Sequence, residues 1–352
     1  MELLSVTMND GVMPRSEIEG KDNSSEDKSN YKVVITGDMV YNSMRMWQGA
    51  NGISPCDGIV SPAYTVLMPK IPISNGYFAA LFKSPNLINE FRKNSQGMTS
   101  DTWNLKYPQI ETIKVCVPSL PEQERVADMI GTLEQRIAKQ TQLIDALKKY
   151  KTGLLEQIFS DISKSYRRSK LRDLVHVSGG KTPSMNNSLY WNGDIVWISS
   201  KDMKSNRIYD SELKITTLAL NEMTLYHPGT LLLVARSGIL KHTLPLSVLE
   251  VEATINQDIK ALHVHGCNSL YLYYAILAQE DNIIRTHVKT GTTVQSLMMD
   301  SFMDIEIPIA DIEQQQTIAS KLSKIEQYVE GHMKTLSELT QMRAGLLQQL
   351  FI

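Results

Sequence analysis

The sequence predicts an α+β fold, in which two strand-rich globular domains are joined by two long helices. We expect these helices to form an antiparallel coiled coil and the chain to have an approximate internal twofold. Three observations support this prediction: a repeated segment, two heptad patterns, and a region with short apolar stretches before each heptad pattern.

The end of the first half of the chain recurs at the end of the second half. Residues 153–159 (GLLEQIF) return as residues 345–351 (GLLQQLF), 192 positions later, and Glu134 returns as Glu326. Such a repeat indicates two copies of one module. Two similar modules on one chain suit a target that itself has two parts.

Each copy of the repeat carries a heptad pattern. Apolar residues recur at alternating spacings of four and three over residues 126–158 and 318–350, and no proline interrupts either run. The apolar stripe is narrow and is flanked by Gln, Lys and Glu. This favours a coiled coil over two core helices of an ordinary helical protein, the alternative, which would show a wider apolar face. The predicted interface residues are Val126, Ile130, Leu133, Ile137, Ile144, Leu147, Leu154, Ile158, Ile318, Leu322, Ile325, Val329, Leu336, Leu339, Leu346 and Leu350.

Both runs turn polar at the same two steps, at Gln140 and Lys151 in the first and at His332 and Arg343 in the second. A long stretch of chain separates the runs, so we expect them to pair across the whole molecule. An antiparallel arrangement would bring Gln140 and His332 together near the middle of the rod. A polar residue at such a position lowers stability but can fix the register.

Composition limits the class of protein. With 42% hydrophobic residues in 352, the chain can form cores for two domains and a rod. Its three cysteines, Cys56, Cys116 and Cys267, are far apart, which indicates a reduced cytoplasmic protein and argues against a zinc site. The start resembles no signal peptide, and no apolar stretch is long enough to cross a membrane. A net charge of −2 means that any nucleic-acid binding would depend on local basic surfaces.

Outside the heptad runs, in residues 1–117 and about 165–307, the sequence pattern changes. Short apolar stretches at 64–68, 112–117, 195–198 and 231–234 indicate strands, and residues 76–93 and 269–287 indicate helices. The predicted division is a first globular domain over 1–117, a first long helix and basic linker over 118–164, a second globular domain over 165–307, and a second long helix over 308–352.

No residue pattern indicates catalysis. The segment GGKT at 179–182 mimics a phosphate-binding loop, but Val175 stands where that loop needs glycine, and Pro183 follows. His263, His265 and Cys267 alternate along a predicted strand and would point to opposite faces, so we expect no metal site. The carboxylates near residue 250 only loosely resemble a nuclease set and have no counterpart in the first half. We therefore expect a protein that is not an enzyme.

The second domain opens with residues that resemble a known family. LRDL at 171–174, SGGKTPS at 178–184, and a segment from Tyr190 to WISSKD at 197–202 resemble the opening of a target-recognition domain in the specificity subunits of type I restriction–modification systems. GDMVYNSMRMW at 37–47 resembles another version of that domain. The resemblance covers essentially the whole chain.

The resemblance implies a subunit that reads a split double-stranded DNA sequence, one part with each domain. It also implies two methyltransferase subunits and restriction (nuclease–translocase) subunits as partners. S-adenosylmethionine, Mg and ATP would act in those partners, with no cofactor bound by this chain. Matching Gly37 with Gly229 places the opening of the second domain about twenty positions before Met1. The sequence thus gives the expectation that the first recognition domain lacks its opening segment.

Side chains that read DNA reach base edges from polar loops, as Arg or Lys does to guanine and Asn or Gln to adenine. The candidate DNA-binding residues are Arg45, Gln48, Asn51, Arg92, Lys93, Gln96 and Thr99 in the first domain, and Lys181, Arg236, Lys241, His242, Asn256, Gln257, Lys289, Thr290, Thr292 and Thr293 in the second. The alternative function is a coiled-coil adaptor that binds protein or sugar partners and not DNA, which the near-neutral charge would suit.

Overall fold

The structure is a computed structural model that describes residues 1–8, 10–20, 22, 24–99, 103–289 and 294–351. The chain divides into two compact units. Unit 1 comprises residues 1–144 and 332–352, and unit 2 comprises residues 145–331. Thr290, Thr292 and Thr293 of the candidate set lie outside the described residues.

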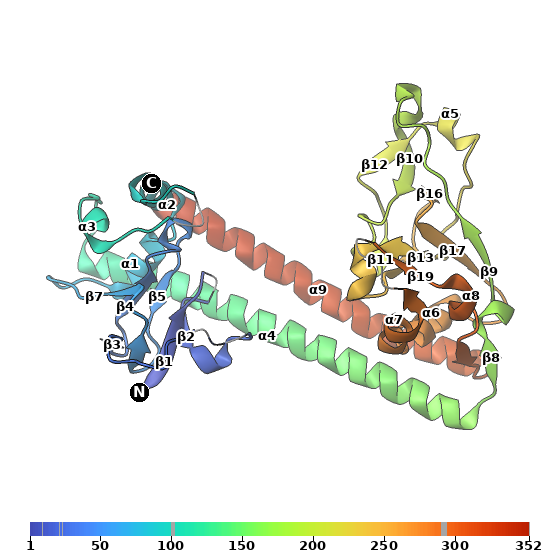
Figure 1. The fold of residues 1–352 in the computed structure, drawn as a ribbon, viewed down its shortest axis with the longest axis horizontal. Coiled ribbons are helices and arrows are strands. Elements are labelled where there is room, and N and C mark those ends of the chain that lie inside the picture. Colours follow the sequence, from blue (N-terminus) through green and yellow to red (C-terminus); the bar gives the residue numbers. More distant parts are fainter. Residues whose placement is uncertain (9, 21, 23, 100–102, 290–293, 352) are drawn as a thin grey trace. The chain divides into compact units, whose positions relative to one another are not determined.

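Two long helices, α4 (Leu120–Ser165) and α9 (Ile312–Leu350), each contribute to both units and pack together (Figure 1). In unit 1, Gln140 Nε2 donates to the His332 carbonyl at 2.9 Å and lies 2.8 Å from His332 Nδ1. In unit 2, Lys151 Nζ lies 2.7 Å from Glu326 Oε1. Contacts advance along α4 as they retreat along α9, so the helices are antiparallel. The α+β class with paired long helices is thereby confirmed.

The heptad residues are buried to different extents along each run. Ile130 and Leu322 are 2% and 0% exposed, whereas Leu350 is 37% exposed. Near the C-terminal end of each helix the buried face rotates, because the apolar residues there pack against a globular part. The residues buried at these ends are Leu155, Phe159, Ile162, Leu347 and Phe351.

Unit 1 holds a four-stranded sheet of order β2-β1-β6-β3 and a three-stranded sheet of order β5-β4-β7. Its strands are β1 (Glu2–Val6), β2 (Val12–Pro14), β3 (Lys32–Val34), β4 (Met39–Asn42), β5 (Asn51–Ile53), β6 (Gly58–Val60) and β7 (Tyr64–Leu67). Its shorter helices are η1 (Arg15–Glu17), η2 (Met46–Gln48), α1 (Asn75–Leu81), α2 (Pro85–Asn94) and α3 (Tyr107–Ile110).

Unit 2 has a five-stranded sheet of order β11-β15-β13-β17-β9, two three-stranded sheets, β12-β10-β16 and β14-β19-β18, and the pair β20-β8. The strands are β8 (Arg168–Lys170), β9 (Val175–Gly179), β10 (Trp191–Ile198), β11 (Arg207–Ile208), β12 (Leu213–Ile215), β13 (Leu231–Val234), β14 (Arg236–Ser237), β15 (Leu246–Leu249), β16 (Ala253–Ile255), β17 (Ile259–Val264), β18 (Val288–Lys289), β19 (Gln295–Leu297) and β20 (Glu306–Pro308). The helices are η4 (Leu171–Asp173), η5 (Ser188–Tyr190), α5 (Thr217–Leu220), η6 (Gly238–Lys241), α6 (Ser269–Leu277), α7 (Glu280–His287) and α8 (Met299–Phe302).

The central strand β13 is buried on both faces, which explains its continuous apolar sequence LLLV. Leu231 and Leu233 join a core with α6 and the long helices, whereas Leu232 and Val234 join a core with β10, β16 and β17. Side chains of a strand alternate between faces, so an apolar run is required where both faces are covered.

The sequence repeat corresponds to repeated contacts. Gln123 Oε1 accepts from Ser74 N at 3.0 Å while its Nε2 donates to the Pro118 carbonyl at 3.0 Å. In unit 2, Gln315 makes the matching bonds, accepting from Asn268 N at 2.8 Å and donating to the carbonyl of Ala310 at 2.7 Å. Each glutamine therefore fastens the start of a long helix to the short helix that begins after Ser74 or Asn268.

Aromatic contacts repeat in the same way. Phe351 packs against Tyr77 in unit 1, and Phe159 packs against Tyr271 in unit 2, each with ring centroids 5.3 Å apart. The GLLEQIF-type repeat thus ends in a phenylalanine that packs on a buried tyrosine in both units.

Three local expectations differ from the structure. Residues 76–93 and 269–287 each form two helices; α2 starts separately because the Ser84 side chain accepts from Leu87 N and Pro85 occupies the first turn. Residues 112–117 form no strand, whereas their counterpart β20 pairs with β8. The predicted basic linker is the end of α4 followed by β8, where Arg168 lies 3.3 Å from Glu306.

Candidate DNA interface

In unit 2 several polar candidate residues gather where β13 ends. Ala235 N donates to the Asp258 carbonyl at 2.8 Å, and Leu297 N donates to the Ala235 carbonyl at 2.8 Å. These bonds hold β14, β19 and the turn before β17 against one another. The polar residues that follow β13 and precede β17 are therefore neighbours, although they are separated in sequence.

The small sheet β14-β19-β18 places two cations beside one hydroxyl. Arg236 and Lys289 both pair with Ser296, so the three side chains lie in a row on one face. Arg236 and Lys289 are exposed, as are Lys241 and His242 in and after η6. Guanidinium and ammonium groups in this arrangement can contact phosphates or the acceptor edge of guanine.

The GGKT segment has a structural role beside this row. A Cβ on Gly180 would lie 1.9 Å from the Ile255 carbonyl, so only glycine allows the close approach in which Lys181 N donates to that carbonyl at 3.0 Å. Thr182 Oγ1 then donates to Gln257 Oε1 at 2.6 Å. This arrangement places Lys181, Thr182 and Gln257 next to the turn that carries Asp258.

Asn256 behaves differently from the other candidates. It is 6% exposed, and its Oδ1 accepts from Asp258 N at 3.1 Å. Asn51 in unit 1 is fully buried, and its Nδ2 donates to the Gly49 carbonyl at 3.0 Å. Both amides are buried and bond to the backbone of a turn, so neither faces the surface from which a base could be reached.

Unit 1 repeats the backbone of the site. Ser43 N donates to the Ala63 carbonyl at 3.4 Å, and Leu105 N donates to the Ser43 carbonyl at 2.8 Å. With offsets of 192 to 195 residues, these are the counterparts of the bonds around Ala235. The turn η2 follows β4 as η6 follows β13 and β14, so both units present a polar turn at the same structural position.

The side chains on this shared backbone differ. In unit 1, Trp47 packs edge-on against Trp103 at 5.1 Å, and the Arg92 guanidinium lies over the Trp47 ring at 5.8 Å. Arg45 stands at the N-cap position of η2 without a side-chain capping bond and is exposed, and Gln48 is the last residue of η2. The tryptophan thus brings the η2 candidates and the end of α2 together.

Three further candidates lie near the end of α2. Lys93 is exposed and lies 2.7 Å from Glu90 in an exposed ion pair, which contributes little to stability. Gln96 forms a β-bridge with Asn104, and Thr99 is exposed. Sequence reasoning missed Trp47, Trp103 and Ser296 as members of these sites. The tryptophan at 47 was visible beside Arg45, but nothing local marked Ser296.

A histidine cluster lies on the β9–β17 edge of unit 2. His263 Nε2 is 2.8 Å from Ser178 Oγ, and its ring stacks on Tyr226 with centroids 5.7 Å apart. Burial, together with the neighbouring His176, lowers the pKa of His263 below its usual value of 6.5. The neutral imidazole is therefore favoured here, which suits a hydrogen-bonded sheet edge.

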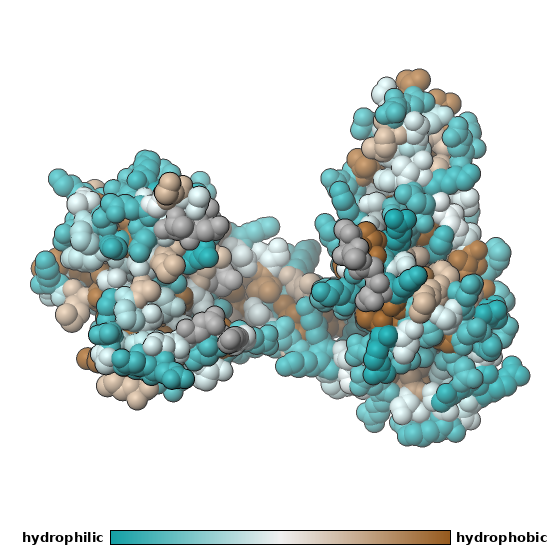
Figure 2. All heavy atoms as spheres, viewed as in Figure 1, coloured by the Kyte–Doolittle hydropathy of each residue, from teal (hydrophilic) through white to brown (hydrophobic). Residues whose placement is uncertain are grey.

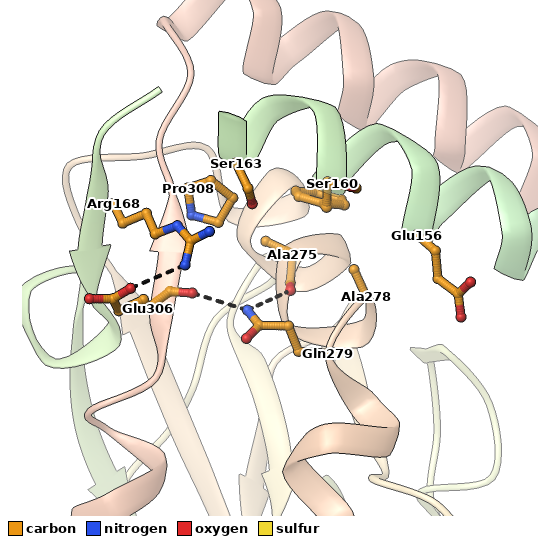
Figure 3. Close-up of a pocket in the computed structure, with 10 residues that line it drawn as sticks. Glu156, Ser160, Ser163, Arg168, Ala275, Ala278, Gln279, Glu306 and Pro308 are labelled. Atoms are coloured by element: carbon orange, nitrogen blue, oxygen red, sulfur yellow. Dashed lines mark hydrogen bonds and ion pairs between the residues drawn. The ribbon is translucent and has the colours of Figure 1, made fainter. Parts of the chain in front are cut away.

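An open pocket of about 290 Å³ lies between the end of α4, the end of α6 and β20 (Figure 3). Among the lining residues, Arg168 lies 3.3 Å from Glu306, and Gln279 Nε2 donates to the Glu306 carbonyl at 3.2 Å. Across the described residues no group of three or more His, Cys, Asp or Glu side chains could hold a metal ion. Within the same part of the chain, no helix has the length and apolar character that a membrane span requires.

Two units repeat one surface turn and share a pair of antiparallel helices. Residues 164–341, just over half of the 352, match the family model described as the type I restriction modification DNA specificity domain. The chain belongs to this family.

Known relatives agree. The chain is 31% identical over 242 residues to the type I restriction enzyme EcoR124I/EcoR124II specificity subunit of Escherichia coli, covering 66% of this chain and 59% of that protein. It is 30% identical over 210 residues to the MjaIX specificity subunit of Methanocaldococcus jannaschii, covering 58% of this chain and 48% of that one. The chain thus spans between about half and three fifths of these relatives.

The fold also resembles a solved structure. The type I restriction–modification system S subunit from M. genitalium superposes with a TM-score of 0.66 over 99% of this chain and 94% of that one, at 14% identity. At this identity the likeness supports the fold alone.

Proposed function

We propose that this chain reads a two-part sequence in double-stranded DNA, with one part contacted by each unit. The observation that carries the proposal is the repeated site backbone. Ser43 and Ala235 each hold a polar surface turn by the same pair of backbone bonds. Different side chains on one repeated frame are what a protein needs to read two different short sequences.

The charge distribution supports DNA as the ligand. Arg236, Lys241, His242 and Lys289 are exposed around one turn of a chain whose formal net charge is −2. Cations gathered on one surface of a near-neutral protein favour a local phosphate contact. Family membership also disfavours the adaptor alternative, in which the domains would bind protein or sugar.

We further propose that the helices hold two methyltransferase subunits and recruit restriction (nuclease–translocase) subunits. Met129, Leu143 and Tyr150 of α4 are 48%, 40% and 60% exposed and fall at one heptad position. Tyr328 and Met342 of α9 occupy the corresponding position and are 58% and 56% exposed. Figure 2 shows hydrophobic residues among hydrophilic ones on the visible face of each unit. Equivalent apolar rows on both helices suit two identical partners.

In this scheme the chain catalyses no reaction and acts in the cytoplasm. S-adenosylmethionine would be bound by the methyltransferase subunits, and ATP and Mg would serve the restriction subunits. The division of labour predicts that purified chain alone methylates and cleaves nothing.

The test begins with co-expression of the chain and the methyltransferase encoded beside it, followed by selection of bound duplexes from a randomised library. We expect two short conserved blocks separated by a fixed gap. Binding should weaken steeply with salt, because each phosphate contact releases counterions. A flat salt dependence, or a selected pool with no common sequence, would contradict the proposal.

The variants then assign the surface. Arg236→Gln and Lys289→Gln should each weaken binding of the selected duplex by about 5-fold to 150-fold, the equivalent of about 1–3 kcal/mol. The matched control is Arg172→Gln, which also removes an exposed cation of unit 2 but one that lies 2.9 Å from Asp304. Equal losses in all three variants would mean that only net charge matters.

A further inference from the structure

A buried carboxylate on α9 gathers donors from three other elements of unit 2. The Glu326 side chain is 3% exposed. Its Oε1 accepts from Lys151 Nζ of α4 at 2.7 Å and from Asn206 Nδ2, just before β11, at 2.6 Å. Its Oε2 accepts from the Tyr274 hydroxyl of α6 at 3.1 Å. The recognition sheet and both long helices thus meet at one charged group.

A second connection lies one helical turn away. Arg207 of β11 donates through Nη2 to Ser323 Oγ of α9 at 3.1 Å, and its Nη1 bonds to Glu250 just after β15. The Asn206 carbonyl accepts from Val248 N at 2.8 Å, so the residues that reach α9 also belong to the sheet. The edge β11–β15 is therefore fixed to α9 by side chains and to the sheet by its backbone.

Burial of this cluster is costly and is not required for helix pairing. Removing a carboxylate from water is unfavourable unless several donors replace the lost hydration. Burial is the larger cause that raises the pKa of Glu330, and the negative charge of the nearby Glu326 is the second. Glu326 therefore also influences a group outside its own hydrogen bonds. The repeat counterpart Glu134 is 38% exposed and lies 3.4 Å from Lys83. Since α4 and α9 pair there as well, the buried arrangement at Glu326 has another role.

That role follows from where the cluster lies on the sheet. Glu250 follows the end of β15, beside the start of β13, because Leu231 pairs with Val248. Arg236 follows the other end of β13. Five residues of strand at about 3.4 Å each separate these ends by about 17 Å. Tilting the sheet by about 10° at the cluster would then move Arg236 by about 3 Å, close to the 3.4 Å spacing of stacked bases.

We propose that Glu326, with Asn206 and Arg207, forms a positioning cluster that sets the angle of the second recognition sheet on α9. The cluster thereby fixes the gap at which the second part of the DNA target is read. Glu326 touches no DNA in this scheme and acts through the sheet that carries Arg236. The inference rests on the proposed DNA-reading function.

The test compares wild type with Glu326→Gln and Asn206→Ala, using Glu134→Gln as the matched control. The first measurement needs no DNA: hydrogen exchange of the Val248 and Glu250 amides, which donate to Asn206 and Ile208. We expect exchange to accelerate about tenfold, equal to about 1.4 kcal/mol, in both test variants and to stay unchanged in the control.

The second measurement repeats the duplex selection with the methyltransferase complex. The wild type and the control should select one gap length, while the test variants should select the same bases with gaps one base pair shorter and longer as well. Unchanged gap preference with faster exchange would overturn the positioning role. Unchanged exchange in both test variants would overturn the mechanical link itself. A wild type that selects no DNA sequence would refute the proposed function, while the exchange data would still decide whether the cluster fixes the sheet. Asn206→Ala keeps the test decisive if Glu326→Gln does not fold.

Discussion

Phe159 packs the end of α4 against the globular part of unit 2, so replacing it tests how much this contact stabilises the unit. The side chain is 6% exposed and packs against Tyr271, which is fully buried, with ring centroids 5.3 Å apart. The perturbation is Phe159→Ala. Its counterpart Phe351→Ala removes the ring that packs on Tyr77 in unit 1.

The expected magnitude comes from the size of the lost side chain. Truncating a buried phenylalanine to alanine costs about 3–5 kcal/mol, because both transfer energy and a cavity contribute. The aromatic pair adds about 0.5–1.5 kcal/mol to what burial alone provides. A domain is typically stable by about 5–15 kcal/mol, so unit 2 should become marginally stable while unit 1 is unaffected.

The four tryptophans allow the two units to be observed separately. Trp47 and Trp103 lie together in unit 1, and Trp191 and Trp197 lie together in unit 2, each pair 5.1 Å apart. Replacing either pair by phenylalanine leaves fluorescence that reports one unit. Urea titrations in each background should show Phe159→Ala lowering only the unit 2 midpoint.

The reverse pattern is expected for Phe351→Ala, which should lower only the unit 1 midpoint. A loss below about 1 kcal/mol in unit 2 would mean that Phe159 is not part of the core. If either variant lowered the midpoints of both units equally, the two units would unfold as one. The separate aromatic contacts would then not account for the stability of each unit.

Three other outcomes are expected. Gln315→Ala should destabilise unit 2 by about 1–3 kcal/mol, since it leaves two backbone groups without their partner. Gln123→Ala should destabilise unit 1 by the same amount. Urea titrations that show no loss of stability would contradict this role of the two glutamines. Because the folded-state pKa of His263 is lowered, the unfolded state takes up the proton first, so unit 2 should lose stability as pH falls below about 6.5. His263→Gln should flatten that part of the thermal melting profile between pH 8 and pH 5, and an unchanged slope would assign the effect elsewhere. Cysteines at Leu133 and Arg343, with the native cysteines replaced by serine, should crosslink within a monomer, whereas crosslinks only between chains would make the helices an intermolecular device.

The long helices could be predicted because their signal is local and periodic. Their ends could be only partly predicted. At the start of α4, Ser119 N and Oγ both donate to the Glu122 carboxylate, and the spacing of this serine and glutamate is readable in the sequence. At the other end the buried face turns from Leu154 to Leu155, because a globular surface replaces the opposite helix as neighbour. Such a change of partner has no signature in the heptad pattern.

The candidate DNA-binding residues were predicted from the polar composition of loop-like stretches. Composition does not show whether an amide side chain points inward or outward. Asn51 and Asn256 stand in polar, turn-forming stretches, yet both are buried with an internal hydrogen bond. Arg236 and Lys289 stand in similar stretches and lie side by side because each pairs with Ser296. Only pairing between distant segments distinguishes a residue that shapes a turn from one that faces outward.

The residues that attach the long helices to the globular parts lie in repeated sequence, whereas the residues proposed to contact DNA differ between the two units. Gln123, Gln315, Phe159 and Phe351 lie in repeated sequence, and each fastens a long helix to a globular surface. Arg236, by contrast, lies on a repeated backbone but carries a side chain with no match in unit 1. Under the proposed function, two equivalent attachments need like side chains, whereas two different DNA sequences need unlike ones. The contacts that repeat are therefore those that hold the helices, and specificity should be sought where the backbone repeats but the side chains do not.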